Sequence, residues 1–150
     1  MVTPSFRVVV CEDDPAMVRI FQFLLQKQGI GPVLTVSDGT KVVSLVQREK
    51  PQLVLLDLML PGKDGLSILK ELKSNETTSG IPVIVISGIE SQNQVSQAID
   101  AGAADYVTKP FDSMELGARL KLFLNSLYNA SSPDAGSGTP PPSISSGGNR

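Results

Sequence analysis

The chain lacks histidine and tryptophan, and it has one cysteine, Cys11. A single cysteine cannot build a disulfide framework, and the absence of histidine excludes both a Cys/His zinc site and a catalytic triad with a histidine base. Cys11 adjoins acidic residues at the end of a predicted strand, and neighbouring carboxylates would raise the pKa of the thiol. We therefore interpret it as a buried structural thiol and not as a redox centre.

An excess of positive charge and long apolar runs are also missing. The 13 basic and 15 acidic residues give a net charge of −2, so a broad surface for nucleic acid is not expected. No apolar run approaches the ~18 residues that a membrane span needs, and the first residues carry no apolar segment typical of a signal peptide. We expect a soluble, cytoplasmic protein that binds neither nucleic acid nor membrane directly.

The last part of the chain has a different composition. Between Ser131 and Arg150, fourteen of twenty residues are serine, glycine or proline. Such a segment buries too little apolar surface to offset its ordering entropy. We predict a folded domain over residues 1–128 and a disordered tail or linker over residues 129–150, with a proline-rich ligand as the alternative interpretation of the tail.

Strand-like and helix-like segments alternate five times before that tail. Short, largely apolar segments predict strands, and each is followed by a segment with helical spacing of apolar residues. The predicted strands are residues 7–11, 33–36, 53–56, 83–86 and 105–108. This alternation predicts an α/β fold: a doubly wound, five-stranded parallel sheet in the flavodoxin-like order 2-1-3-4-5, with helices on both faces.

Several residues are typical of helix ends. Asp14 followed by Pro15 predicts a helix start, Gly29 a helix end, and Asp38 the cap of a second helix. Asp112 and Glu115 suit a capping box before the last helix. That helix places apolar residues on one face: Leu116, Leu120, Phe123, Leu124 and Leu127.

In such a sheet, ligands bind beyond the carboxyl ends of the strands. Five chemically capable side chains follow four predicted strands: Glu12, Asp13, Asp57, Ser87 and Lys109. Taken singly, each has an ordinary explanation as a loop acid, a helix cap or a surface charge. We interpret them together as one site, because the fold brings these strand ends to the same edge.

Three carboxylates in one cleft repel each other unless a cation lies among them, and a site with only oxygen ligands favours Mg²⁺. This set is typical of phosphoryl transfer, which depends on positioning and charge neutralisation. Asp57 ends a buried strand and is the predicted nucleophile. Glu12 and Asp13 are predicted metal ligands, together with the backbone carbonyl of Met59. Asp14 is assigned to capping.

The two remaining side chains have predicted roles around the phosphoryl group. Lys109 would pair first with the Asp57 carboxylate and then with the phosphoryl oxygens. Ser87 would donate a hydrogen bond to the phosphoryl group once it is attached to Asp57. No further cofactor is expected.

Four segments resemble the receiver domain of bacterial two-component response regulators. Residues 8–15 resemble its acidic first turn, residues 55–65 its phosphoacceptor segment, residues 84–88 its switch strand, and residues 105–111 the segment with its lysine. The segments occur in the order of the family and span the chain from Met1 to about Tyr128.

The resemblance implies that a sensor histidine kinase or a phosphotransfer protein transfers a phosphoryl group to Asp57 with Mg²⁺ present. Ser87 would then move toward the phosphoryl group and Tyr106 would turn inward. This would remodel the face of helix four, strand five and helix five, which would bind a downstream protein or the chain's own output domain. The resemblance also implies a cis Lys109–Pro110 peptide. The protein would not be an enzyme beyond its own phosphorylation and dephosphorylation.

Two further hypotheses follow from positions that vary in the family. Met59 and Ile89 are apolar where polar residues help to orient a hydrolytic water, so we predict slow autodephosphorylation. Asp105 and residues 115–120 resemble members that form phosphorylation-dependent homodimers. However, helix four offers Gln92, Gln94 and Gln97 and not the basic residue that those members use.

Three alternatives stay open at this point. The chain could be a receiver-like interaction module without phosphorylation, although such modules usually lose an acid or the lysine. It could resemble a phosphohydrolase of the haloacid dehalogenase type, but the general acid two residues after the nucleophile is replaced here by Met59. It could also be the N-terminal receiver of a longer regulator and not a stand-alone switch.

Overall fold

The computed structural model describes residues 6–88 and 91–131. The chain divides into two compact units, Met1–Pro110 and Phe111–Arg150, which we describe separately. Most of the predicted Ser/Gly/Pro-rich tail lies outside the described residues, as does Ile89. The prediction of a disordered tail therefore stays a prediction.

The first unit is built on a five-stranded parallel sheet in the order β2-β1-β3-β4-β5. The strands are β1 (Val8–Cys11), β2 (Leu34–Val36), β3 (Leu53–Leu56), β4 (Val83–Ser87) and β5 (Asp105–Thr108). β1, β3 and β4 are buried along their whole length, as expected for central parallel strands that are covered on both faces. The predicted strand order is confirmed.

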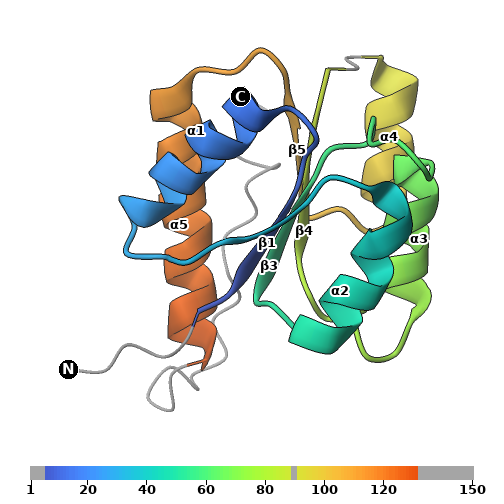
Figure 1. Ribbon diagram of the computed structural model, residues 1–150, viewed down its shortest axis with the longest axis horizontal. Coiled ribbons are helices and arrows are strands. Elements are labelled where there is room, and N and C mark those ends of the chain that lie inside the picture. Colours follow the sequence, from blue (N-terminus) through green and yellow to red (C-terminus); the bar gives the residue numbers. More distant parts are fainter. Residues whose placement is uncertain (1–5, 89–90, 132–150) are drawn as a thin grey trace. The chain divides into compact units, whose positions relative to one another are not determined.

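Helices cover both faces of this sheet (Figure 1). They are α1 (Pro15–Gln26), α2 (Val42–Glu49), α3 (Gly65–Ser74) and α4 (Gln92–Asp100). α1 lies on one face, and α2, α3 and α4 lie on the other. Successive strand residues point to opposite faces, so alternate residues such as Val9 and Cys11 join one apolar core that also includes Val46 and Leu69.

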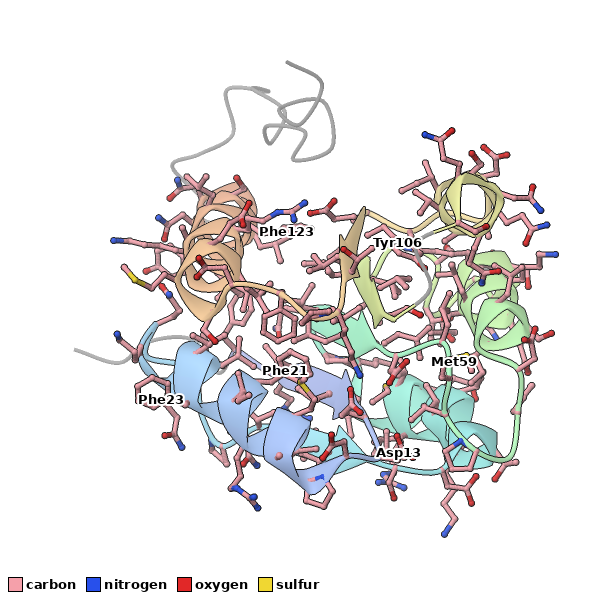
Figure 2. The ribbon with its side chains drawn as sticks, turned by 90° about the horizontal axis from the view of Figure 1, so that it is seen from above. Asp13, Phe21, Phe23, Met59, Tyr106 and Phe123 are labelled. Atoms are coloured by element: carbon pink, nitrogen blue, oxygen red, sulfur yellow. The ribbon has the colours of Figure 1, made fainter. Side chains whose placement is uncertain are left out.

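α1 illustrates how the sequence pattern positions a helix. Phe21 is only 1% exposed and points toward the sheet, whereas Phe23 is 58% exposed and points away from it (Figure 2). The Asp14 side chain accepts a hydrogen bond from the Ala16 N–H at 3.0 Å, and Pro15 is the first helical residue. Gly29, with φ of +84°, follows the end of the helix. The predicted capping role of Asp14 is confirmed.

Element boundaries differ slightly from the prediction. Asp38 caps a short 3-10 turn, Gly39–Lys41, which lies between β2 and α2 and was not predicted. The third helix already begins at Gly65, and Ser87 belongs to β4. Boundaries of this kind depend on which backbone groups find partners, which apolar periodicity does not encode.

The described part of the second unit consists mainly of α5 (Ser113–Ser131). Asp112 Oδ1 accepts hydrogen bonds from the N–H groups of Met114 at 2.8 Å and Glu115 at 3.3 Å. Leu116 and Leu120 are buried on the predicted apolar face. The helix continues past the predicted end of the fold at Tyr128. Among the described residues, neither α5 nor another helix is long and apolar enough to cross a membrane.

Candidate functional site

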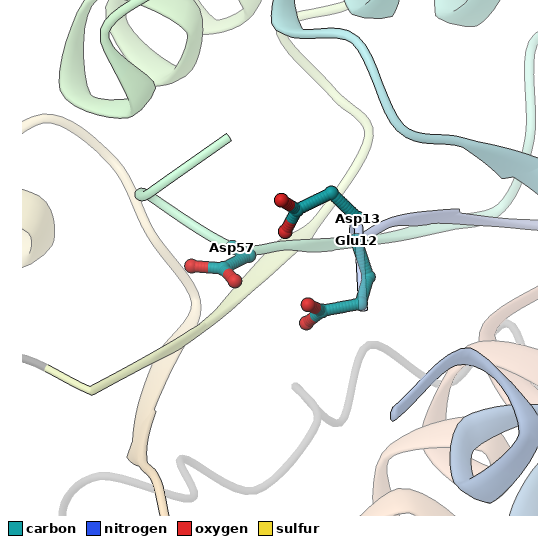
Figure 3. A group of neighbouring side chains, drawn as sticks. All are labelled: Glu12, Asp13 and Asp57. Carbon is teal, nitrogen blue, oxygen red and sulfur yellow. The ribbon is translucent and has the colours of Figure 1, made fainter. Parts of the chain in front are cut away.

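Three carboxylates meet at the carboxyl ends of β1 and β3 (Figure 3). One oxygen from each of Glu12, Asp13 and Asp57 lies within 4.8 Å of the others. The strand register explains this proximity, because Cys11 lies opposite Leu56 and the Asp57 N–H donates to the Cys11 carbonyl at 3.0 Å. Glu12 and Asp57 are buried, and Asp13 is exposed. The predicted convergence of these acids is found in the structure.

Lys109 brings a positive charge to two of these acids. Its Nζ donates to Asp57 Oδ2 at 2.9 Å and to Glu12 Oε1 at 2.8 Å. Burial acts to lower the pKa of Lys109, but the hydrogen bonds and the charge attraction of the two carboxylates together outweigh it, and the pKa is raised. The contact with Asp57 was predicted, whereas the contact with Glu12 was not. The Lys109–Pro110 peptide is cis, as the resemblance implied.

Glu12 is held at both of its carboxylate oxygens. Oε1 accepts from Lys109, and Oε2 accepts from the Asp14 N–H at 3.1 Å. Burial raises the pKa of Glu12, because removal from water disfavours the charged form. The hydrogen bonds with Lys109 and Asp14 oppose this increase but do not cancel it.

The Asp57 carboxylate is likewise oriented from two sides. Lys109 binds Oδ2, and the Met59 N–H donates to Oδ1 at 2.9 Å. Met59 lies in the segment between β3 and α3, and it is 61% exposed (Figure 2). The assignment of its backbone carbonyl as a metal ligand stays a prediction.

Ser87 and Tyr106 lie on the two neighbouring strands. Ser87 is fully buried at the end of β4, and its carbonyl accepts a hydrogen bond from the Lys109 N–H at 2.8 Å. Tyr106 is half-buried in β5, opposite Val85. This backbone hydrogen bond connects the end of β4 to Lys109, directly after β5. The switch roles of Ser87 and Tyr106 stay predictions.

Cys11 lies directly before Glu12 but is closed to solvent. Its side chain is buried, and burial raises the pKa of the thiol well above the ordinary range. The interpretation as a structural thiol agrees with this. The cause of the higher pKa is burial, and not the neighbouring carboxylates that the sequence suggested.

A second contact near the site, besides that of Lys109 with Glu12, was not predicted from the sequence. The Gly39 N–H donates to the Pro61 carbonyl at 2.8 Å, so the 3-10 turn after β2 contacts the loop after Asp57. Asp38 was interpreted only as a helix cap, Gly39 was given no role, and Pro61 and Gly62 were placed only within the phosphoacceptor segment. Gly39 and Gly62 were the signal in the sequence, because glycine, which has no Cβ atom, allows two backbones to approach closely.

The carboxylate oxygens and the lysine ammonium decide what this site can bind. The acidic cluster can hold a metal ion, and its oxygen ligands suit a hard cation. Lys109 supplies a further positive charge at Asp57, so the site can neutralise negative charge on a group bound there.

The family model described as the response regulator receiver domain matches residues 8–121. The chain belongs to the response regulator receiver family. All residues of the site described above lie within the matched range, and so do all five strands of the sheet. The predicted resemblance is thereby confirmed for most of the chain.

Solved receiver structures have the same fold. The BeF₃-activated N-terminal receiver domain of RstA from Klebsiella pneumoniae is 33% identical, with a TM-score of 0.70, covering 79% of this chain and 97% of that one. The phosphorylated cyanobacterial phytochrome response regulator RcpA is 29% identical, with a TM-score of 0.73 and coverages of 85% and 96%. The receiver domain of the sensor histidine kinase PA1611 from Pseudomonas aeruginosa PAO1 has magnesium coordinated in its active-site cleft. It is 28% identical, with a TM-score of 0.71 and coverages of 81% and 99%.

Proposed function

We propose that this receiver is a phosphorylation-activated switch of a two-component phosphorelay, with Asp57 as its phosphoryl acceptor. The observation that carries the proposal is the position of Asp57. Its carboxylate lies within 4.8 Å of those of Glu12 and Asp13, and its Oδ2 is 2.9 Å from Lys109 Nζ. A carboxylate beside both a candidate cation site and a lysine is suited to accept a phosphoryl group.

The donor would be a sensor histidine kinase or a phosphotransfer protein. An Asp57 oxygen would attack the phosphorus of the donor's phosphohistidine. The new O–P bond forms as the P–N bond breaks, and the electron pair stays with the imidazole. The Met59 N–H holds Oδ1 and Lys109 holds Oδ2, so the acceptor carboxylate is oriented before the donor arrives.

We assign the metal ligands to Asp13, Asp57, Glu12 and the Met59 carbonyl. Mg²⁺ would neutralise negative charge on the transferring phosphoryl group, which is the chemistry that a divalent ion supplies in such sites. The oxygen-only donor set supports this choice, and so does the magnesium in the cleft of the PA1611 receiver domain. Lys109 would exchange its contact with Asp57 Oδ2 for the phosphoryl oxygens.

Output would follow from changes at Ser87 and Tyr106. The Ser87 hydroxyl would bind the phosphoryl group, and Tyr106 would turn inward from its half-buried position in β5. These movements would change the surface of α4, β5 and α5, where a downstream protein or an output domain would bind. Phosphorylation-dependent homodimerisation through the same elements is a separate hypothesis. The protein would catalyse only its own phosphorylation and dephosphorylation.

The direct test is phosphorylation by acetyl phosphate, followed by intact mass spectrometry. The wild-type chain is expected to gain one phosphoryl group only when Mg²⁺ is present, and Asp57→Asn is expected to gain none. Asp100→Asn, at the exposed end of α4, is a matched control that should behave as the wild type. Both variants replace one carboxylate by an amide of the same size.

The opposite outcome is equally informative. If the wild-type chain gains no mass with Mg²⁺, or if Asp57→Asn still does, Asp57 is not the acceptor. The better interpretation would then be a receiver-shaped interaction module that works without phosphorylation.

A further inference from the structure

Two loops from non-adjacent strands contact each other beside the acidic cluster. We call residues 38–40, between β2 and α2, the β2–α2 corner, and residues 58–64, between β3 and α3, the acceptor loop. β1 separates β2 from β3 in the sheet. The corner nevertheless reaches the acceptor loop, because the Gly39 N–H donates to the Pro61 carbonyl at 2.8 Å.

Gly39 leaves no room for a side chain at this contact. A Cβ atom added there would lie 3.0 Å from the Lys63 carbonyl oxygen and 3.1 Å from that of Pro61. These are backbone atoms, so they cannot rotate away as the end of a flexible side chain would. An alanine at this position would have to push the acceptor loop away by a few tenths of an ångström.

Gly62, which follows Pro61 in the acceptor loop, also lies against the β2–α2 corner. Gly62 has φ of +94°, and a Cβ atom there would lie 2.5 Å from Asp38 Oδ1. Asp38 Oδ1 is itself held by the N–H of Thr40 at 2.9 Å and by its hydroxyl at 2.8 Å. The corner therefore presents a fixed surface to Pro61 and Gly62.

The contact leads directly to the acceptor carboxylate. Pro61 is two residues after Met59, and the Met59 N–H donates to Asp57 Oδ1. The far end of the loop is equally confined, because a Cβ on Gly65 would lie 2.3 Å from the Leu58 Cα. Because both ends of the loop are confined in this way, a displacement of Pro61 would be transmitted to Met59 and to the orientation of Asp57.

We propose that Gly39 is a positioning residue for the metal site: its contact with Pro61 sets the place of Met59 and of the Asp57 carboxylate relative to Asp13. The inference rests on the proposed function, since it assumes that a divalent cation binds this cluster. Residues that orient metal ligands without touching the metal commonly change affinity by tenfold or more when they are replaced.

The test measures Mn²⁺ binding to the full chain by electron paramagnetic resonance of the free ion, which needs no phosphorylation. Gly39→Ala is expected to raise the Kd by about tenfold. Gly80→Ala is the matched control, because a Cβ there meets nothing within 4 Å, and its Kd should equal that of the wild type. Thr40→Val removes one hydrogen bond to Asp38 and should raise the Kd by about threefold.

Thermal unfolding with and without Mg²⁺ separates positioning from simple destabilisation. A positioning role predicts that the increase in Tm caused by Mg²⁺ shrinks in Gly39→Ala, because weaker binding gives less stabilisation. A purely structural role would lower Tm equally in both conditions and leave the Kd unchanged, and this result would overturn the inference. If Gly39→Ala does not fold, the Kd of Thr40→Val decides: an increase supports the inference, and an unchanged value overturns it.

The failure of this inference can be told from that of the proposed function. If the wild type binds Mn²⁺ and the corner variants bind it equally well, only the positioning role of Gly39 is wrong. If the wild type and Gly80→Ala bind no Mn²⁺, the metal site and the inference fail together.

Discussion

Lys109 and Glu12 form a 2.8 Å hydrogen bond across 97 residues of sequence. The Glu12 side chain is only 1% exposed and that of Lys109 19% exposed, so little water screens the pair. The same ammonium also binds Asp57. Without a metal ion, a single ammonium therefore contacts two buried carboxylates and offsets their negative charge only in part, so both depend on it.

Replacement of Lys109 should expose this dependence. Lys109→Met leaves Glu12 and Asp57 buried without a cation, and we expect the free energy of unfolding to fall by about 3 kcal/mol in metal-free buffer. Urea denaturation measures the loss. Lys70→Met, on the exposed face of α3, is the control and should stay within about 0.5 kcal/mol of the wild type.

A double variant shows whether charge is the cause. In Lys109→Met combined with Asp57→Asn, only one buried carboxylate is left, so part of the lost stability should return. If the double variant is as unstable as the sum of the two single variants, repulsion between Glu12 and Asp57 does not explain the effect.

Glu12 should make stability depend on pH in a defined direction. Its pKa is raised above the ordinary value of 4.5, so the folded protein binds this proton more tightly than the unfolded chain does. The contribution of Glu12 to the free energy of unfolding is therefore fully present below pH 4.5 and decreases as pH rises through the raised pKa. In metal-free buffer, the wild type should lose stability relative to Glu12→Gln as pH rises from 4.5 toward neutral. A wild type that keeps or gains stability relative to Glu12→Gln over this range would contradict the prediction.

Lys50 is a site for stabilisation. It follows the last residue of α2 as its C-cap, with φ of +48° and ψ of +60°, a left-handed conformation that is unfavourable for residues with a Cβ atom. Lys50→Gly should raise the free energy of unfolding by about 1 kcal/mol in urea denaturation. Lys50→Ala removes the side chain but keeps the Cβ, so it should bring no comparable gain. Equal stability of the two variants would show that the backbone conformation is not limiting.

Met59 should control the lifetime of the phosphorylated protein. Its side chain is apolar and largely exposed beside Asp57, and it offers no group to orient an attacking water. We expect slow autodephosphorylation in the wild type and a lifetime shortened by about tenfold or more in Met59→Asn. Met59→Leu should match the wild type. A wild-type lifetime under about a minute, as followed by intact mass, would contradict the prediction.

The fold was predictable from local patterns because its three central strands, β1, β3 and β4, are buried along their whole length. Leu53–Leu56 is entirely apolar, ends at a carboxylate, and is found as β3 with those bounds. The 3-10 turn at Gly39–Lys41 was not predictable in this way. Its formation depends on Asp38 and on a hydrogen bond to a loop more than twenty residues away, which apolar spacing does not report.

The candidate site was predictable in its members but not in its contacts. The carboxyl ends of parallel strands meet at one edge, so Glu12, Asp13, Asp57 and Lys109 could be assigned together from the order of the strands. The second partner of Lys109 and the contact between Gly39 and Pro61 could not be predicted from the sequence. They depend on side-chain reach and on backbone approach within a few ångströms, which residue type alone does not specify.

The burial of Cys11 has a practical consequence for spectroscopy. It is the only cysteine of the chain, it is 1% exposed, and its pKa is raised, so maleimide reagents will find almost no thiolate there. A cysteine introduced at Ser96, on the exposed face of α4, would be the single reactive thiol without removal of the native one. A fluorophore attached there would report movement of α4 against an otherwise unlabelled background, since the chain also lacks tryptophan.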